Sequence, residues 1–208
     1  MEVLILDNII DNIECKIWLT SDLHFGHQKE FLYGPRGYAS NMEMVKDVVE
    51  RWNKKVAPED HVYILGDLMV GEDEIFALYM LQELNGHLHI ALGNHDTARR
   101  KDLYEKLLHP DEIALAFRLR YKKFSCYLSH YPTLTSNYDD EEPLYTRVIS
   151  FCGHTHTKDP FHDWEKGTIY HVELDAHDNE PVLIDDAIEQ MKQKIREAKI
   201  CKETENMI

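Results

Sequence analysis

Five short segments of this chain each place metal-type ligands directly after an apolar run that is typical of a β-strand. The segments are Asp22-Leu23-His24, Gly66-Asp67, Gly93-Asn94-His95-Asp96, Ser129-His130 and Gly153-His154-Thr155-His156. Any one of them alone also fits a turn or a surface loop, because Gly, Asn and Asp tolerate turn geometry. Open α/β sheets place their ligands at the carboxyl ends of strands. The shared position of all five segments therefore predicts a sheet whose strand ends bring these side chains together.

Strands and helices alternate through the first half of the sequence. Apolar runs at 16–20, 61–65 and 87–92 predict strands, and helices are expected at about 41–56, 72–84 and 98–108. The first helix starts at a capping-box pattern, Ser40-Asn41-Met42-Glu43. This order favours a βαβ core with parallel pairing.

The second half changes character. Residues 112–120 and 123–128 are expected to pair as strands around Tyr121-Lys122, and 131–146 is expected to form an exposed acidic loop. Further strands are predicted at 147–152, 168–174 and 181–184, followed by a helix at 185–199 within a C-terminal helix and tail, 185–208. Residues 2–6 and 9–14 predict a short hairpin, so 1–15 is interpreted as an N-terminal extension. We predict an α/β fold that leans towards α+β, in a single domain over 1–208.

Charge and composition narrow the function classes. The chain has 208 residues and a formal net charge of −15, which repels phosphate backbones and disfavours long nucleic acids as partners. No stretch is long enough to span a membrane, and the acidic N-terminus does not fit a signal peptide. Four scattered cysteines give no disulfide framework. We expect a cytoplasmic protein without a membrane partner.

Together, the five segments supply two carboxylates, one amide and four imidazoles. That set is sufficient to hold two divalent metal ions side by side, and Asp67 is the natural bridge because it lies between the other ligand segments. Two adjacent ions can share a hydroxide of lowered pKa that attacks phosphorus in line. Mixed oxygen and imidazole ligands favour Mn²⁺, with Fe, Zn²⁺ or Ni²⁺ as alternatives.

Four further side chains are candidates around that centre. His95 is expected to donate a proton to the leaving group, and Asp96 to orient it. His27 and Arg36 are candidates for substrate phosphate binding, since Arg matches phosphate geometry. For Asp175, a role in a turn is preferred to one in orienting a ligand histidine.

In order, the motifs D-x-H, GD, GNHD, an isolated His and GHTH resemble those of the calcineurin-like metallophosphoesterase family, over about residues 17–156. The stretch SDLHFGH at 21–27 and the segment 31–36 resemble the small bacterial and phage-type members. The resemblance implies two mixed sheets in a sandwich flanked by helices, and His95 as general acid or transition-state donor. It implies one metal held by Asp22, His24, Asp67 and His156, and the other by Asp67, Asn94, His130 and His154.

The function that follows is hydrolysis of a phosphate ester of a small molecule or nucleotide. Monoesterase and diesterase activities are not separated, because the same two metals serve both. Two alternatives stay open: a catalytically silent metal-binding module of the same fold, and a nuclease on short oligonucleotides. The oligomeric state is also open, with a dimer as one alternative.

Overall fold

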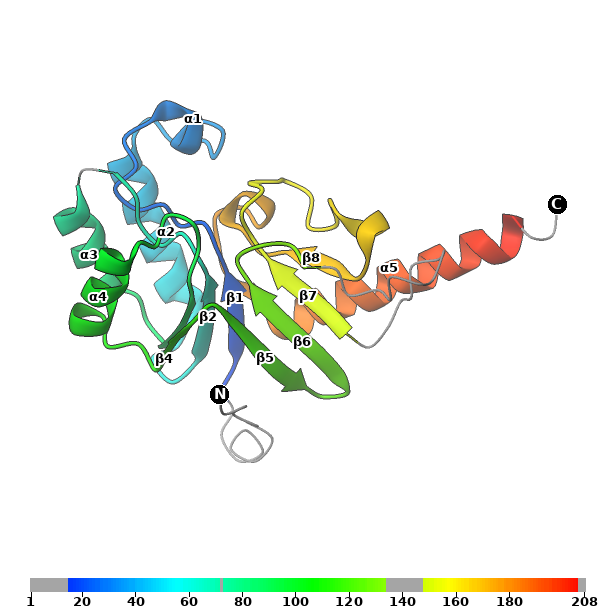
Figure 1. The fold of residues 1–208 in the computed structure, drawn as a ribbon. Helices are drawn as coiled ribbons and strands as arrows, with labels where there is room; N and C mark the ends of the chain where they lie inside the picture. The colour runs from blue at the N-terminus through cyan, green and yellow to red at the C-terminus, as the bar shows by residue number, and fades with distance from the viewer. Residues whose placement is uncertain (1–14, 72, 134–147, 206–208) are drawn as a thin grey trace.

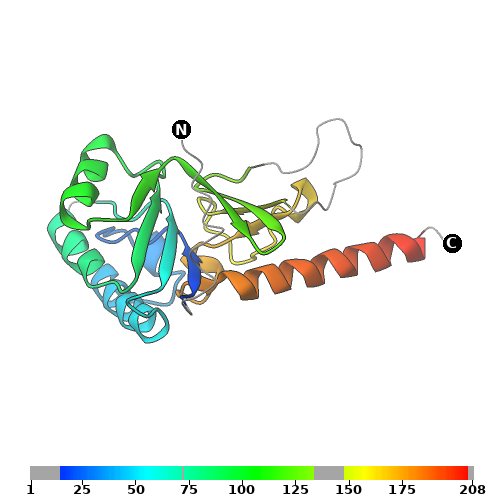
Figure 2. The same cartoon turned by 90° about the horizontal axis from the view of Figure 1, so that it is seen from below.

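Two β-sheets and one layer of helices make up the body of the molecule. In the computed structural model, which describes residues 15–71, 73–133 and 148–205, one sheet has five strands and the other has four. Figure 1 shows helices α2 (Asn41–Lys55), α3 (Glu74–Gln82) and α4 (Ala98–Leu107) on one side of the larger sheet, with the smaller sheet on its other side. Seen from below in Figure 2, helix α5 (Ile184–Glu205) runs out from the sheets towards the C-terminus.

The larger sheet comes mainly from the first half of the chain. Its order is β4-β3-β2-β1-β9, and every pairing is parallel except that of β9 with β1. The strands are β1 (Ile17–Thr20), β2 (His61–Leu65), β3 (His87–Ala91), β4 (Glu112–Ala114) and β9 (Val182–Leu183). The connecting helices are α1 (Glu30–Tyr33), α2 (Asn41–Lys55), α3 (Glu74–Gln82) and α4 (Ala98–Leu107). The predicted parallel βαβ core is confirmed.

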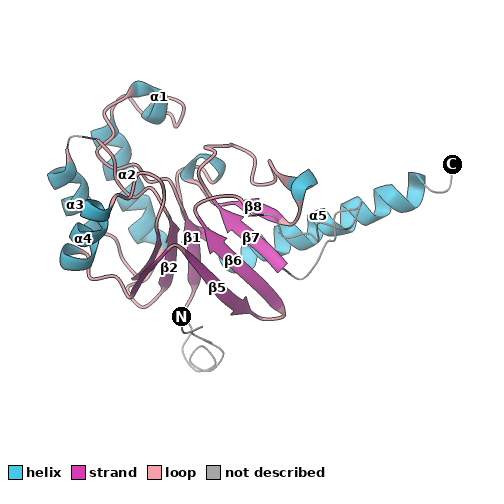
Figure 3. Ribbon diagram, viewed as in Figure 1, coloured by secondary structure: helices cyan, strands magenta, loops and turns pink. Residues whose placement is uncertain are grey.

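The smaller sheet mixes the two pairing directions. Its order is β5-β6-β7-β8, antiparallel between β5 and β6 and parallel thereafter. The strands are β5 (Ala116–Tyr121), β6 (Phe124–Ser129), β7 (Val148–Cys152) and β8 (Ile169–His171). Two 3₁₀ turns, Trp164–Lys166 and Leu174–Ala176, flank β8, and α5 spans Ile184–Glu205. Figure 3 shows the strands of both sheets lying between the helices, which confirms two mixed sheets flanked by helices.

Each face of the larger sheet buries its own apolar cluster. On the outer face, Trp18, Val62 and Ile64 pack with α2 and α3. On the inner face, Leu19 and Leu65 pack with the smaller sheet and with the first turns of α5. Because alternate residues of a strand point to opposite faces, these continuous apolar runs are those of strands buried on both sides.

The predicted strand 112–120 is wrong in one respect, because it is two strands in two sheets. Glu112–Ala114 pairs with β3, and Ala116–Tyr121 pairs with β6. Between them, the side chain of Leu115 is 78% exposed. The apolar pattern runs through this crossing point unbroken, so the sequence carried no turn signal there.

Other boundaries moved as well. The strand predicted at 168–174 ends at His171 and passes into the 3₁₀ turn Leu174–Ala176. The short helix α1 was not predicted. The predicted hairpin at 2–6 and 9–14 and nearly all of the acidic loop at 131–146 lie outside the described residues. Within the described ranges, no helix has the length and apolar character needed to cross a bilayer.

Candidate metal centre

The predicted ligands lie in loops at the carboxyl ends of five strands. Strands β1, β2 and β3 of the larger sheet lead into Asp22 with His24, Asp67 and Asn94, while β6 and β7 of the smaller sheet lead into His130 and into His154 with His156. The seven side chains come together in two groups. Both sheets contribute to each group, so the centre joins them.

The first group consists of Asp22, His24, His156 and Asp67. The Nε2 atoms of His24 and His156 lie 3.0 Å apart, and each lies 3.6 Å from Oδ1 of Asp22. Oδ2 of Asp67 is 3.6 Å from His24 Nε2. Ligands at about 2.0–2.2 Å from one ion, at roughly 90–110° to each other, are separated by about 2.8–3.6 Å. The spacing within this group therefore fits a single divalent ion.

The second group consists of His130, Asn94, His154 and Asp67. His130 Nε2 lies 2.9 Å from Asn94 Oδ1, 3.1 Å from His154 Nδ1 and 3.5 Å from Asp67 Oδ2. The same Asp67 oxygen thus faces both groups. A carboxylate in this position is the arrangement expected of a ligand shared by two ions.

Both carboxylates divide their oxygens between the backbone and the centre. Asp22 Oδ2 accepts a hydrogen bond from the backbone N–H of His154, and Asp67 Oδ1 accepts one from that of His95. Asp22 Oδ1 is buried without a hydrogen-bond partner among the described residues. Burial opposes ionisation of Asp22, but the neighbouring His24, with further charge from His156, lowers its pKa to about 2. A buried ionised oxygen without a partner is a strong reason for a cation to bind there.

The imidazoles are oriented by groups behind them. His130 Nδ1 donates to the backbone carbonyl of Leu65 at 2.9 Å, which leaves the Nε2 lone pair for the centre. His156 Nδ1 lies 2.9 Å from Asp175 Oδ2, which orients its Nε2 in the same way. Burial opposes protonation of His156, but Asp175 and Asp22 together raise its pKa. Such partners are typical of metal-ligating histidines.

Five of the seven ligand residues have a left-handed backbone conformation. Their φ angles lie between 49° and 76°, at Asp22, His24, Asp67, His154 and His156. Non-glycine residues rarely adopt this region, and such strain gathers at functional sites held by the surrounding structure. The loops turn sharply after each strand and aim their side chains back across the strand ends.

Two glycines of the motifs are required by close approach. A Cβ on Gly93 would overlap Oδ1 of Asp67, and one on Gly153 would overlap Oδ2 of Asp22. A third, Gly66, combines a φ of 91° with a Cβ position 2.6 Å from His130 Nδ1. Each of these three glycines therefore leaves room for a predicted ligand from a neighbouring loop.

The structure gives Asp96 a different position from the one expected beside the His95 ring. Its carboxylate is buried and accepts hydrogen bonds from four groups, the backbone N–H of Asp67, Leu68 and Gly93 and the hydroxyl of Tyr104. Burial raises its pKa. Asp96 therefore fixes the loops after β2 and β3 to each other. His95 lies at the rim, with 45% of its side chain exposed and Nε2 4.0 Å from Asp67 Oδ2.

Arg36 also lies in a different setting from the expected phosphate contact. Its guanidinium is buried, donates to both oxygens of Asp175 at 3.0 and 2.6 Å, and donates to the backbone carbonyl of Asp22 at 2.8 Å. Arg36, Asp175 and His156 thus form one chain of contacts behind the first metal group. Asp175 lies in a 3₁₀ turn, as preferred from the sequence, and it also contacts His156, which is the alternative that the sequence left open. Sequence spacing gave no signal for the contact between Arg36 and Asp175, because these residues are 139 positions apart.

His27 lies at the rim beside His24 and Phe31. Its ring centroid is 6.1 Å from that of His24 and 5.1 Å from that of Phe31. Tyr131, which received no role from the sequence, is half exposed, and its ring centroid lies 4.9 Å from that of His154. These rings border the centre on two sides.

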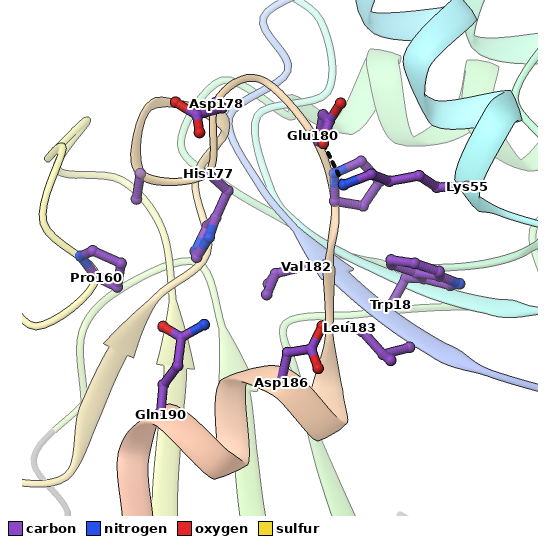
Figure 4. Close-up of a pocket in the computed structure, with 12 residues that line it drawn as sticks. Trp18, Lys55, Pro160, His177, Asp178, Glu180, Val182, Leu183, Asp186 and Gln190 are labelled. Carbon is purple, nitrogen blue, oxygen red and sulfur yellow. Dashed lines mark ion pairs between the residues drawn. The ribbon is translucent and has the colours of Figure 1, made fainter. Parts of the chain in front are cut away.

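One hollow lies away from this centre, near the start of α5. It has a volume of about 400 Å³, and its lining includes Trp18, Lys55, His177 and Glu180 but none of the predicted ligands. Figure 4 shows Lys55 reaching across to Glu180, with which it forms an ion pair. The metal groups are an open cluster of polar side chains at the strand ends, and this hollow does not extend into them.

The family model for the calcineurin-like phosphoesterase superfamily domain matches residues 15–172. The chain belongs to this superfamily. The match contains all seven predicted ligands, which confirms the resemblance drawn from the motifs.

Individual relatives agree with this membership of the calcineurin-like phosphoesterases. The gene 66 protein of Mycobacterium phage D29 is 31% identical over 202 residues, covering 87% of this chain and 98% of the phage protein. An uncharacterized protein of Methanocaldococcus jannaschii is 39% identical over 82 residues, which are 39% of this chain and 47% of that protein. This chain thus matches less than half the length of the archaeal relative.

A solved structure shows the same fold. The crystal structure of a protein of unknown function from Aquifex aeolicus superposes with a TM-score of 0.65 at 19% identity, covering 85% of this chain and the whole of that one. The calcineurin-like phosphoesterases are metal-dependent, and the Asp and His groups described above can bind metal. The chain is therefore a metal-dependent phosphoesterase in its broad class.

Proposed function

We propose that this protein hydrolyses a phosphate ester of a small molecule or nucleotide with two divalent ions held by the seven ligands. The observation that supports it best is the position of Asp67 Oδ2, which is 3.6 Å from His24 Nε2 in one group and 3.5 Å from His130 Nε2 in the other. We propose Mn²⁺ as the working ion, with Fe, Zn²⁺ and Ni²⁺ as alternatives that the same donor atoms accept.

The residues divide the chemistry between them. Two bound ions would supply Lewis acidity at the phosphoryl oxygens and lower the pKa of water. His95 is half exposed at the rim, where its Nε2 can give a proton to the leaving oxygen. Asp96 holds the loops that carry Asp67 and Asn94, and Arg36 acts through Asp175 on the ligand His156. We propose positioning roles for Asp96 and Arg36, and substrate contact for His27 and His95.

The acidic surface favours small substrates over long nucleic acids. The net charge of −15 repels a phosphate backbone over long range, whereas a small phosphate ester meets chiefly the local field of the ions. His27, Tyr131 and His95 border the predicted ligands, where the leaving group of a substrate would lie. A short oligonucleotide is the second candidate, because it carries few phosphates for the acidic surface to repel.

The test is hydrolysis of paired nitrophenyl phosphate mono- and diesters. Metal-stripped protein reloaded with Mn²⁺ is expected to turn over at least one of the two. Preference for the diester directs the search to cyclic nucleotides and short oligonucleotides, and preference for the monoester points to a small-molecule phosphatase. Two bound ions without turnover of either ester would replace the proposal with a silent metal-binding module.

A further inference from the structure

A second cluster of metal-type ligands lies at the opposite end of the strands. His61 is the first residue of β2, His87 is the first residue of β3, and His89 follows in β3. The register pairs His61 with His87 and Tyr63 with His89. Because residues two apart in a strand share a face, His61 and both β3 histidines point to the same side of the sheet. Asp111 reaches the cluster from the segment just before β4.

Donor atoms converge within this cluster. His61 Nδ1 lies 3.0 Å from His89 Nε2, and Asp111 Oδ2 lies 3.9 Å from the same His89 nitrogen. Asp111 is also 3.4 Å from His87 Nδ1. Donors at about 2.0–2.2 Å from an ion cannot be more than about 4.4 Å apart. One ion can therefore reach His61, His89 and Asp111 with only a small rotation of the exposed Asp111 side chain.

The surroundings of His61 and His89 favour the neutral form of their imidazoles, which is the form that binds a cation. Burial and the neighbouring histidine charges hold the pKa of His61 below its ordinary value and lower that of His89 to about 4. Both rings are therefore neutral near pH 7, as metal ligands must be. Three carboxylates, Asp60, Asp111 and Glu112, lie near this end of β2 and β3 and make the local field attractive to cations.

The ring positions are fixed and the site is reachable. Tyr63 stacks on His89 with the centroids 4.5 Å apart, and His87 stacks on His61 at 5.2 Å. The side chains of His87 and Asp111 are 50% and 42% exposed, so an ion can reach the cluster from solvent on that side. These ligands are at the opposite end of β2 and β3 from the loops that carry Asp67 and Asn94.

We propose that His61, His89 and Asp111 form an additional metal site, separate from the catalytic centre, that takes an imidazole-preferring divalent ion such as Zn²⁺. Two imidazoles and a carboxylate favour Zn²⁺, Ni²⁺ or Cu²⁺ over Mg²⁺ or Ca²⁺. His89 Nδ1 has no hydrogen-bond partner among the described residues, whereas His156 of the catalytic centre has Asp175. We therefore expect weaker binding here than at the catalytic centre. The ion would fasten the starts of β2 and β3 to the segment that leads into β4.

Zinc stoichiometry tests the site. Wild-type protein, His61→Gln and Asp111→Asn are equilibrated with Zn²⁺ over a range of free concentrations, and bound zinc is measured after dialysis. The wild type is expected to bind about one more weakly held zinc ion per chain than either variant. His162→Gln removes an exposed histidine that lies beside β8 in the smaller sheet, and it should bind as much zinc as the wild type.

A second readout separates lost binding from lost folding. His61→Gln should keep its Mn²⁺-dependent turnover of nitrophenyl esters, because it lies at the opposite end of β2 from Asp67. Its melting temperature should rise less on addition of Zn²⁺ than that of the wild type. Equal zinc stoichiometry in wild type, His61→Gln and Asp111→Asn would overturn the proposal, as would the same loss in His162→Gln.

Discussion

Asp67 makes two different contacts with its two oxygens. Oδ1 accepts the backbone N–H of His95, and Oδ2 faces a histidine of each metal group. The side chain of Asp67 is 2% exposed, so solvent water has little access to take the place of a carboxylate oxygen that a mutation removes. The structure places Asp67 between the two groups, where a shared ligand would lie, and its bridging role stays a prediction.

Replacing Asp67 by Asn should disable the enzyme. Loss of one anionic oxygen weakens both metal groups at once, and we expect turnover to fall by more than about 100-fold, beyond the loss typical of residues behind the ligands. Metal analysis together with nitrophenyl ester turnover measures the effect. Asp102→Asn, on the exposed surface of α4, is the matched control. Retention of both ions with near-normal turnover would contradict the shared-ligand role.

The effect of replacing His95 on turnover should depend on the leaving group of the substrate. If His95 donates the proton, His95→Ala should slow esters with poor leaving groups by about 10²- to 10⁴-fold and those with good leaving groups much less. A series of phenyl phosphate esters with graded leaving-group pKa measures the difference. His162→Ala is the control. An equal loss across the series would instead assign His95 to substrate binding or to the support of Asp67.

Asp175 should act on the metal through His156. Burial opposes ionisation of Asp175, but the hydrogen bonds from His156 and Arg36 hold its pKa well below its usual range. We expect Asp175→Asn to lower metal affinity by about 10- to 100-fold, because His156 loses its charged partner. A Mn²⁺ titration measures it, with Asp178→Asn, exposed three residues further on, as the control. Unchanged affinity would leave Asp175 a role in local packing alone.

Among the helices, strands and loops, the sequence predicted best the features that are set by residues close together in the chain. The capping box at the start of α2 is present: Ser40 Oγ accepts the backbone N–H of Glu43 at 3.2 Å, and Glu43 Oε2 accepts that of Ala39 at 2.9 Å. The glycine-bearing ligand loops also follow their strands as expected. These features depend on neighbours within a few positions, which a sequence pattern can contain.

Loss of this cap should cost stability without affecting chemistry. Ser40→Ala leaves a helix N–H without its acceptor, and we expect the free energy of unfolding to fall by about 1 kcal/mol. Urea denaturation measures the change, and turnover should stay at the wild-type level. Ser40→Asp, which can accept the same hydrogen bond, should recover most of the loss. A Ser40→Ala protein as stable as the wild type would show that packing alone sets this end of α2.

The elements that were not predicted depend on contacts distant in sequence. Leu115 passes the chain from one sheet to the other without Gly or Pro, and only the pairing of β4 with β3 and of β5 with β6 reveals the break. The contact of Arg36 with Asp175 likewise depends on the fold to join the segment after α1 with that after β8. Motifs name the seven predicted ligands, and the sequence raised Asp175 as one partner of a ligand histidine, whereas the contacts of Arg36 and Asp96 could not be predicted.

Viewed as a whole, the molecule has its candidate metal centre at the junction of its two sheets. Asp22, Asp67 and Asn94 follow strands of the larger sheet, and His130, His154 and His156 follow strands of the smaller one. Ions bound there should therefore act on the stability of the whole fold as well as on the reaction.

Metal removal should lower the melting temperature. An ion present at about 100 times its dissociation constant adds about 2.7 kcal/mol to the folded state. For a chain of this size, that corresponds to a rise of roughly 5–10 °C for one site. Calorimetry of stripped and Mn²⁺-reloaded protein measures the shift. Asp67→Asn should show a much smaller one, and equal melting temperatures with and without Mn²⁺ in the wild type would contradict the link between the sheets.

The left-handed backbone at five ligand positions has a consequence for how such motifs are recognised. A free peptide with the letters GNHD or GHTH would rarely adopt those angles, because nothing in it offsets their local cost. Only the small fraction of the peptide in those conformations would bind an ion, so its overall affinity would be low. Searches that score only ligand letters will therefore collect many sequences that bind no metal. A more discriminating search would require each motif to follow an apolar strand, because the strands hold the loops in the conformation that brings the side chains together.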